Sequence, residues 1–167
     1  NKLADKQYQK FAAAFGYGDF SVPRTKLSTF ADEILTQYRA RSFETAVGEQ
    51  NNTYRLAMNA ERELPVLAAK TSSAEAKWYT ILGSAPLREV MQTAFGLPSS
   101  FSAIDIDRQV SVLKAKSEAV FGSSDPAQFK DAKTMDALVR RYLLQSDIQA
   151  QATSSSPAAR ALALLQR

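Results

Sequence analysis

Apolar residues recur along this chain at steps of three and four, and strict alternation of apolar and polar residues rarely extends beyond four residues. Steps of three and four place side chains on one face of an α-helix, whereas alternation would indicate a β-strand. Three stripes carry the pattern: Leu27, Phe30, Ile34, Leu35 and Tyr38; Ile106, Val110, Leu113, Ser117, Val120 and Phe121; Met135, Leu138, Val139, Tyr142 and Leu143. The sequence therefore predicts an all-α fold.

Four glycines each follow an apolar residue at the end of a helical pattern: Gly16, Gly48, Gly96 and Gly122. Glycine just beyond a helix adopts the left-handed conformation without a Cβ penalty. We therefore expect a helix to end at each of these four positions.

Helix starts are marked by capping residues. Ser73 and Ser84 lie where a hydroxyl could cap a following helix, Asp125 precedes Pro126 at the start of a short helix, and Thr134 is expected to cap a helix running through Leu144. Pro65 lies in a helical stretch and should kink or divide it after residue 63 or 64. These signals predict eight or nine helices of unequal length in one irregularly packed domain.

The two ends of the chain differ from its middle. A loop at residues 16–23 separates a short first helix from the body, and a Ser-rich segment ending at Pro157 precedes the last ten residues. We expect a helical domain over residues 1–153, and a linker with a helical tail over 154–167. The tail places Ala158, Ala161, Leu162 and Leu165 on one face. It should dock on its own domain; the alternative is that it binds a partner or a neighbouring copy, which would make the protein a homo-oligomer.

The charges are mixed and thinly spread. The 21 basic and 17 acidic residues give a net charge of +4, without a run of like charge. Nucleic acids and anionic membranes are normally bound by a clustered basic face, so we expect neither as a partner. No apolar run reaches the ~18 residues of a membrane span. The chain opens at Asn1 in helix-like sequence, and we expect further residues upstream.

The chain contains no histidine and no cysteine. It therefore lacks the usual proton shuttle, a thiolate nucleophile, disulfides and the two commonest transition-metal ligands. Glu61 and Glu63 are two residues apart on a helix and point in different directions, so ion pairs with Arg55 or Arg62 are expected in place of acid–base chemistry. We expect no catalytic residues, no metal, no cofactor and no enzymatic activity.

An acidic pair at Asp105 and Asp107 resembles the start of a calcium loop. Such a loop needs glycine at its sixth position and glutamate at its twelfth, where this chain has Val110 and Lys116. We therefore interpret the pair as the N-terminus of a helix, where acidic residues are favoured.

The candidate recognition residues lie around the single tryptophan. Trp78 and Tyr79 adjoin on one short helix and Arg88 follows on the next, and aromatic and Arg side chains are favoured at binding hot spots. A tryptophan in a small helical domain can equally be a core anchor whose indole N–H finds a partner. A small-ligand pocket here would also be framed by polar residues of the preceding helix: Asn51, Arg55, Asn59 and Glu63.

Several blocks in the middle of the chain are similar to the bacterial family called domain of unknown function 1217. They are residues 46–51 (AVGEQN), 55–57 (RLA), 61–65 (ERELP), 78–84 (WYTILGS), 86–90 (PLREV) and 94–101 (AFGLPSSF). Residues 3–6 (LADK), 11–15 (FAAAF), 156–157 (SP) and 164–165 (LL) also fit, so the resemblance covers nearly the whole chain.

The resemblance implies an alphaproteobacterial protein whose relatives tend to be encoded among flagellar and motility genes, and it implies no catalytic residues. We therefore expect a non-enzymatic helical protein with a structural, assembly or regulatory role in flagellar biogenesis, acting by contacts with proteins such as flagellar components. The alternative is a small-ligand or sensory module around Trp78, Tyr79 and Arg88. The resemblance leaves open whether the protein stays in the bacterial cytoplasm or is exported to the flagellum.

Overall fold

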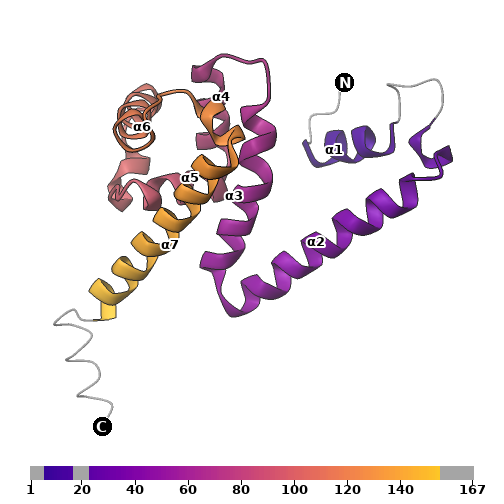
Figure 1. Cartoon of the computed structure of the whole chain (residues 1–167), viewed down its shortest axis with the longest axis horizontal. Coiled ribbons are helices and arrows are strands. Elements are labelled where there is room, and N and C mark those ends of the chain that lie inside the picture. Colours follow the sequence, from indigo (N-terminus) through magenta and orange to yellow (C-terminus); the bar gives the residue numbers. More distant parts are fainter. Residues whose placement is uncertain (1–5, 17–22, 155–167) are drawn as a thin grey trace, which may run out of the picture. The chain divides into compact units, whose positions relative to one another are not determined.

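A computed structural model describes residues 6–16 and 23–154, and every regular element in these ranges is helical (Figure 1), which confirms the all-α prediction. The elements are α1 (Lys6–Phe15), the 3₁₀ turn η1 (Arg24–Lys26), α2 (Phe30–Gln50), α3 (Asn52–Ala68), α4 (Ala74–Gly83), α5 (Ala85–Ala94), η2 (Ser99–Ala103), α6 (Ile106–Phe121), η3 (Pro126–Lys130) and α7 (Ala132–Ser154).

The described ranges contain seven α-helices and three 3₁₀ turns, where eight or nine helices were expected. The expected number included a tail helix over residues 158–167, which lies outside the described residues, and two local features also lower the number. Pro65 does not divide α3, because Leu64 and Leu67 on either side of it are buried in the core and hold the last turn in place. The short helix expected after Asp125 is the 3₁₀ turn η3.

The chain forms two compact units, Asn1–Ala46 and Val47–Arg167, here called the N-terminal unit and the C-terminal unit. The division falls inside α2, so that the last turn of this helix belongs to the C-terminal unit.

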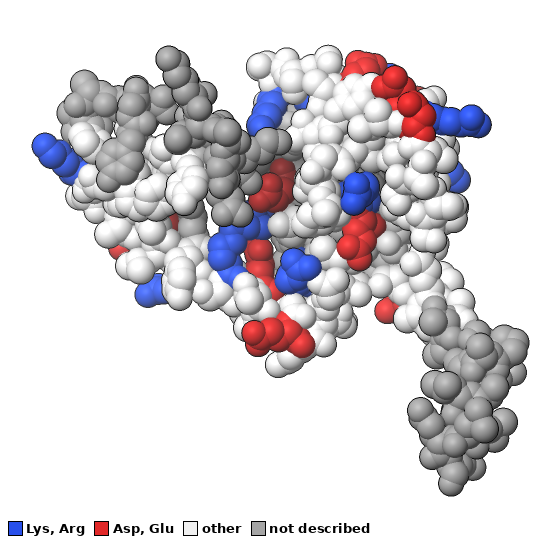
Figure 2. Space-filling view, turned by 180° about the vertical axis from the view of Figure 1, so that it is seen from behind, with Lys and Arg blue, Asp and Glu red and all other residues white. Residues whose placement is uncertain are grey.

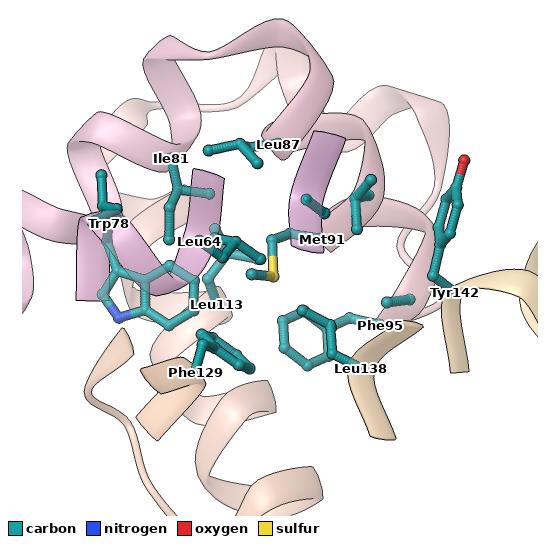
Figure 3. Packing of buried hydrophobic residues seen from close by; sticks show 14 of the residues in the cluster. Leu64, Trp78, Ile81, Leu87, Met91, Phe95, Leu113, Phe129, Leu138 and Tyr142 are labelled. Carbon is teal, nitrogen blue, oxygen red and sulfur yellow. The ribbon is translucent and has the colours of Figure 1, made fainter. Parts of the chain in front are cut away.

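The C-terminal unit contains all 22 residues of the buried apolar cluster. Helices α3, α5 and α7 pack against one another, η3 packs on α3 and α7, and α4 contacts α5, α6 and η3. In Figure 3, Met91 and Leu64 point toward the middle of the cluster, with Trp78 and Phe129 nearby. Burial of side chains of this size supplies most of the favourable free energy of folding.

The second and third apolar stripes are buried largely as their spacing predicts. In α6 the buried face includes Val110, Leu113 and Ser117, and in α7 it includes Leu138 and Tyr142. Val120, Phe121 and Leu143 are partly buried against the same cluster. Ile106 is the exception, because it lies in the first turn of α6 and is half exposed.

Three of the four glycines expected at helix ends, Gly16, Gly96 and Gly122, have positive φ. Gly122 caps α6 in the left-handed conformation and its N–H donates to the Glu118 carbonyl. The expectation for Gly48 is wrong, because α2 continues through it to Gln50.

Asp125 caps η3, accepting from the Ala127 N–H at 2.8 Å, whereas the Ser84 hydroxyl makes no capping hydrogen bond at the start of α5. Ser73 caps α4, its Oγ accepting from the Ala76 N–H at 3.2 Å. The expectation for Thr134 is wrong: Asp131 is the capping acceptor, taking both the N–H and the hydroxyl of Thr134 at 2.9 and 3.0 Å. These donors also lower the pKa of Asp131. The helix that follows continues past Leu144 to Ser154.

Candidate interaction surface

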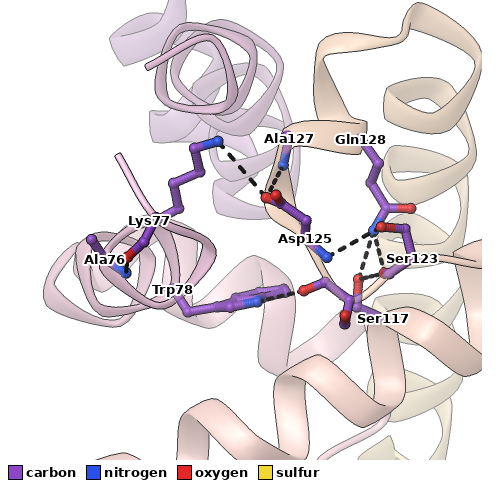
Figure 4. A network of polar contacts seen from close by, with 10 residues as sticks. Ala76, Lys77, Trp78, Ser117, Ser123, Asp125, Ala127 and Gln128 are labelled. Carbon is purple, nitrogen blue, oxygen red and sulfur yellow. Dashed lines mark hydrogen bonds and ion pairs between the residues drawn. The ribbon is translucent and has the colours of Figure 1, made fainter. Parts of the chain in front are cut away.

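Trp78 lies on the inner face of α4 and has no exposed surface. Its indole Nε1 donates to the Ser124 carbonyl at 2.8 Å, which joins α4 to the loop after α6 (Figure 4). A buried indole needs such a partner, because an unpaired N–H in the core costs free energy. The structure thus places Trp78 as a core anchor and not on a surface.

The loop that receives the indole is held by polar contacts with its neighbours. The buried Ser117 hydroxyl donates to the Ser123 carbonyl at 2.8 Å, and the Gln128 amide donates to both of these oxygens. Asp125 accepts from the Ala127 N–H and lies 3.8 Å from the Lys77 ammonium. Figure 4 shows these contacts converging on one turn of chain. They fix the loop and leave no reactive group unpaired there.

Tyr79 and Arg88 do not share a site with Trp78. Tyr79 is 40% exposed on the outer side of α4, and its hydroxyl donates to the Asp107 carboxylate, which raises the pKa of Tyr79. Nearby, Lys114 donates to Glu75 at 2.6 Å and lowers the pKa of that carboxyl. The Arg88 side chain is partly exposed on α5 and makes no hydrogen bond or ion pair within the described residues. The residues proposed to frame one pocket therefore face different surroundings.

The polar residues proposed from α3 have local structural roles. Asn51 caps α3 by accepting from the Thr53 N–H at 2.9 Å, and Arg55 donates to Asn52 Oδ1 at 3.0 and 2.5 Å. Glu63 pairs with Arg62 at 2.5 Å, and Arg62 is one of the two partners that were expected, Arg55 being the other. Asn59 has the one buried side-chain oxygen without a hydrogen-bond partner among the described residues.

The surface that sequence reasoning missed is in the N-terminal unit. Leu27, Leu35 and Tyr38 were predicted to share a helix face, and the structure leaves 52%, 48% and 68% of them exposed. On α1, Tyr8 and Phe11 are 64% and 55% exposed. We call these five residues the N-terminal apolar face. Large apolar side chains left exposed within one small unit are candidates for an interaction site.

Aromatic contacts join the two helices that carry this face. The Phe11 ring stacks on Phe15 with centroids 4.4 Å apart, and Phe15 meets Phe30 edge to face at 5.2 Å. Phe30 and Ile34 are thereby half covered, while Leu35 and Tyr38 one step around α2 are not. Farther along α2, Phe43 is also exposed, at 61%.

Leu162 and Leu165, the candidate contact residues of the tail, lie outside the described residues, as does the expected docking of residues 158–167. No helix in the described ranges is both long and apolar enough to cross a bilayer. Within the same ranges no three acidic residues gather as a metal site would need. On the side of the molecule seen in Figure 2, basic and acidic side chains are interspersed and form no basic cluster in the described part.

Comparison with known proteins gives one finding. No curated protein and no solved structure matches the chain. A family model described as "Protein of unknown function (DUF1217)" matches residues 1–138, which is most of the chain and includes all of the helices from α1 to α6. The match agrees with the resemblance of the central blocks, and the chain belongs to this family.

Proposed function

We propose that this protein acts through protein–protein contacts, without catalysis, in a structural, assembly or regulatory role in flagellar biogenesis or motility. The observation that carries the proposal is the N-terminal apolar face, whose five residues are each about half or more exposed. Large apolar side chains gain free energy when a partner removes them from water. The flagellar setting is supported by the family resemblance, which implies relatives encoded among motility genes.

The rest of the described chain supports a role through surfaces. The interior of the C-terminal unit is filled by apolar side chains. Buried Ser117 and Trp78 hold the loop after α6, and buried Gln109 donates to the Ile104 carbonyl before that helix. Function on such a fold has to be argued from its surface residues. The small-ligand alternative has no comparable support, because Trp78 is buried and Tyr79 is bonded to Asp107 on the outside of α4.

The test is a deletion strain of the native host, scored for swimming and for flagellar filaments, and complemented with variants. We expect the deletion to impair motility, the wild type to restore it, and Tyr38→Glu or Leu35→Glu to fail. Tyr54→Glu is the matched control, because Tyr54 is 53% exposed on α3 of the other unit. Normal swimming of the deletion strain would contradict the flagellar role.

The contact itself is tested separately by crosslinking in living cells with a photoreactive residue at position 38 or 54. We expect crosslinks to another protein from position 38 and not from 54. Equal yields from the two positions would show that the N-terminal apolar face has no special part in binding.

A further inference from the structure

The described part of the N-terminal unit buries little apolar surface. Among its residues whose side chains are described, only Gly16 and Glu44 are buried, so no large apolar side chain described there is buried. Units of about 40 residues usually need metals, disulfides or oligomerisation to fold. This chain has no cysteine to supply a disulfide. Contact with another surface would supply apolar burial that the described residues lack.

One line of residues on α2 is suited to pack against a second helix. Ala31, Leu35, Tyr38 and Ser42 are spaced by four, three and four residues, and all four are exposed. This spacing forms the seam of a coiled coil, which takes small and apolar residues. No charged residue interrupts the seam.

The charges beside this seam have a two-fold arrangement. Asp32 and Arg39 follow Ala31 and Tyr38, lie seven residues apart on the same edge of the seam, and are both exposed. Neither makes a hydrogen bond or ion pair within the described residues. Two copies of α2 that cross in antiparallel orientation near Thr36 would bring Asp32 of each copy opposite Arg39 of the other. A parallel pair would set this edge of one helix against the opposite edge of the other, so Asp32 and Arg39 would not meet.

The same crossing matches the sizes of the seam residues. It sets Leu35 opposite Tyr38 of the other copy and Ala31 opposite Ser42, so that large side chains meet large ones and small ones allow close approach. We infer that the N-terminal unit binds a second copy of this chain, through an antiparallel two-fold pairing of α2 helices. This self-association goes beyond the proposed flagellar role and does not depend on it.

The exposed apolar area limits how much surface the pairing can bury. With aromatic side chains presenting about 150–250 Å² each, the N-terminal apolar face offers on the order of 500 Å² per copy. A standard interface buries about 800 Å² per partner. The pairing is therefore smaller than a standard interface.

The orientation is tested by charge reversal in the full chain, using sedimentation velocity at low salt to separate monomers of 18.3 kDa from dimers. Asp32→Arg and Arg39→Asp each turn two attractive pairs into two repulsive ones, and each is expected to weaken the dimer on the order of ten-fold. An equimolar mixture of the two variants should recover the wild-type affinity, because each reversed residue then faces an opposite charge. Recovery in the mixture shows that the single variants lost a pair and not their fold.

The apolar seam is tested with Tyr38→Glu, which is expected to weaken the dimer at least a hundred-fold, against Tyr54→Glu, which should leave it unchanged. A wild-type protein that stays monomeric up to millimolar concentration overturns the inference. So does a dimer that both single reversals leave intact, a mixture that fails to recover, or equal damage from Tyr38→Glu and Tyr54→Glu. Because these measurements use purified protein, they can fail while the motility phenotype holds, and the reverse.

Discussion

The Arg55 side chain lies against the last turn of α2 and determines which residue can occupy position 48. A Cβ atom added to Gly48 would overlap the Arg55 Cδ atom and lie 3.0 Å from Nε. The Arg55 guanidinium is in turn held by Asn52 Oδ1. Glycine is present here to allow a close approach, whereas the sequence pattern suggested a helix end. The approach ties the end of α2 to the start of α3.

The first prediction is that the effect of Gly48→Ala reverses sign with the residue at position 55. In the wild type the substitution should destabilise by about 1 kcal/mol, because Arg55 must leave its contacts with Asn52. In an Arg55→Ala background it should stabilise by about 0.5–1 kcal/mol, since alanine is the better helix former and the overlap is gone. Denaturant unfolding of the four proteins measures this, and the same sign in both backgrounds would contradict the packing.

Tyr142 gives a second prediction at the residue scale, which concerns how the stability of the folded state depends on pH. Burial of its phenol, followed by the charge of Glu89, raises the pKa of Tyr142 from 10.0 to about 12, and the side chain is only 2% exposed. The neutral phenol is therefore favoured in the folded state. Its contribution to stability is complete below pH 10, where the unfolded tyrosine titrates, and is lost as pH rises to about 12. A shift of this size corresponds to about 2–3 kcal/mol.

The measurement is the free energy of unfolding of the wild type and Tyr142→Phe from pH 9 to pH 12, with the exposed Tyr54→Phe as control. The wild type should lose stability relative to Tyr142→Phe across this window, and Tyr54→Phe should follow the wild type. A constant difference between wild type and Tyr142→Phe would mean that the phenol is not buried in the folded state.

At the scale of single helices, the sequence predicted those elements whose apolar faces are buried within one unit. The stripe of α7 is an example, since Leu138 and Tyr142 are buried as their spacing requires. The capping of the same helix was not predicted, because Asp131 and Thr134 are both good caps and only the geometry decides between them. The position where a helix begins thus depends on contacts that the capping preferences of the residues alone do not predict.

The candidate site was harder to predict than the helices. Trp78 and Tyr79 are adjacent in sequence, but successive residues of a helix point about 100° apart, so one enters the core and the other faces Asp107. Which of the two is buried depends on the loop carrying Ser124, 46 residues away. Conversely, the stripe through Leu35 reads like a core face, and nothing local indicates that it stays exposed.

The end of α6 gives a prediction that concerns a whole element. Gly122 has φ of 81° with open space where a Cβ would lie, so Gly122→Ala is expected to destabilise by about 1 kcal/mol through backbone strain alone. Gly83 at the end of α4 also has open space but no positive φ, and Gly83→Ala should be neutral or slightly stabilising. Thermal unfolding of both variants checks the contrast, and equal effects would rule out a left-handed cap.

At the scale of the whole molecule, neither the composition nor the helix pattern indicates the division into two units. The boundary at residues 46 and 47 lies inside one continuous helix, and Gly48 close to it does not end that helix. Sequence reasoning placed its boundary at residue 153, where a Ser-rich stretch begins. Linker composition identifies a flexible join, but it cannot identify a change in how densely a helix is packed along its length.

Because the buried apolar cluster lies in the C-terminal unit, we predict that this unit folds without the first 46 residues. A chain beginning at Val47 retains all 22 residues of the buried apolar cluster, the last turn of α2 and the Asn51 cap of α3. Its free energy of unfolding should stay within about 1 kcal/mol of the full chain, since truncation is tolerated where the removed residues bury little.

A chain beginning at Thr53 lacks the Asn51 cap and should lose about a further 1 kcal/mol. Far-ultraviolet circular dichroism and the fluorescence of Trp78, the single tryptophan, report both transitions. An unfolded Val47 chain would show that the N-terminal unit contributes to this core, and its exposed apolar residues would then be completing their own protein instead of awaiting a partner.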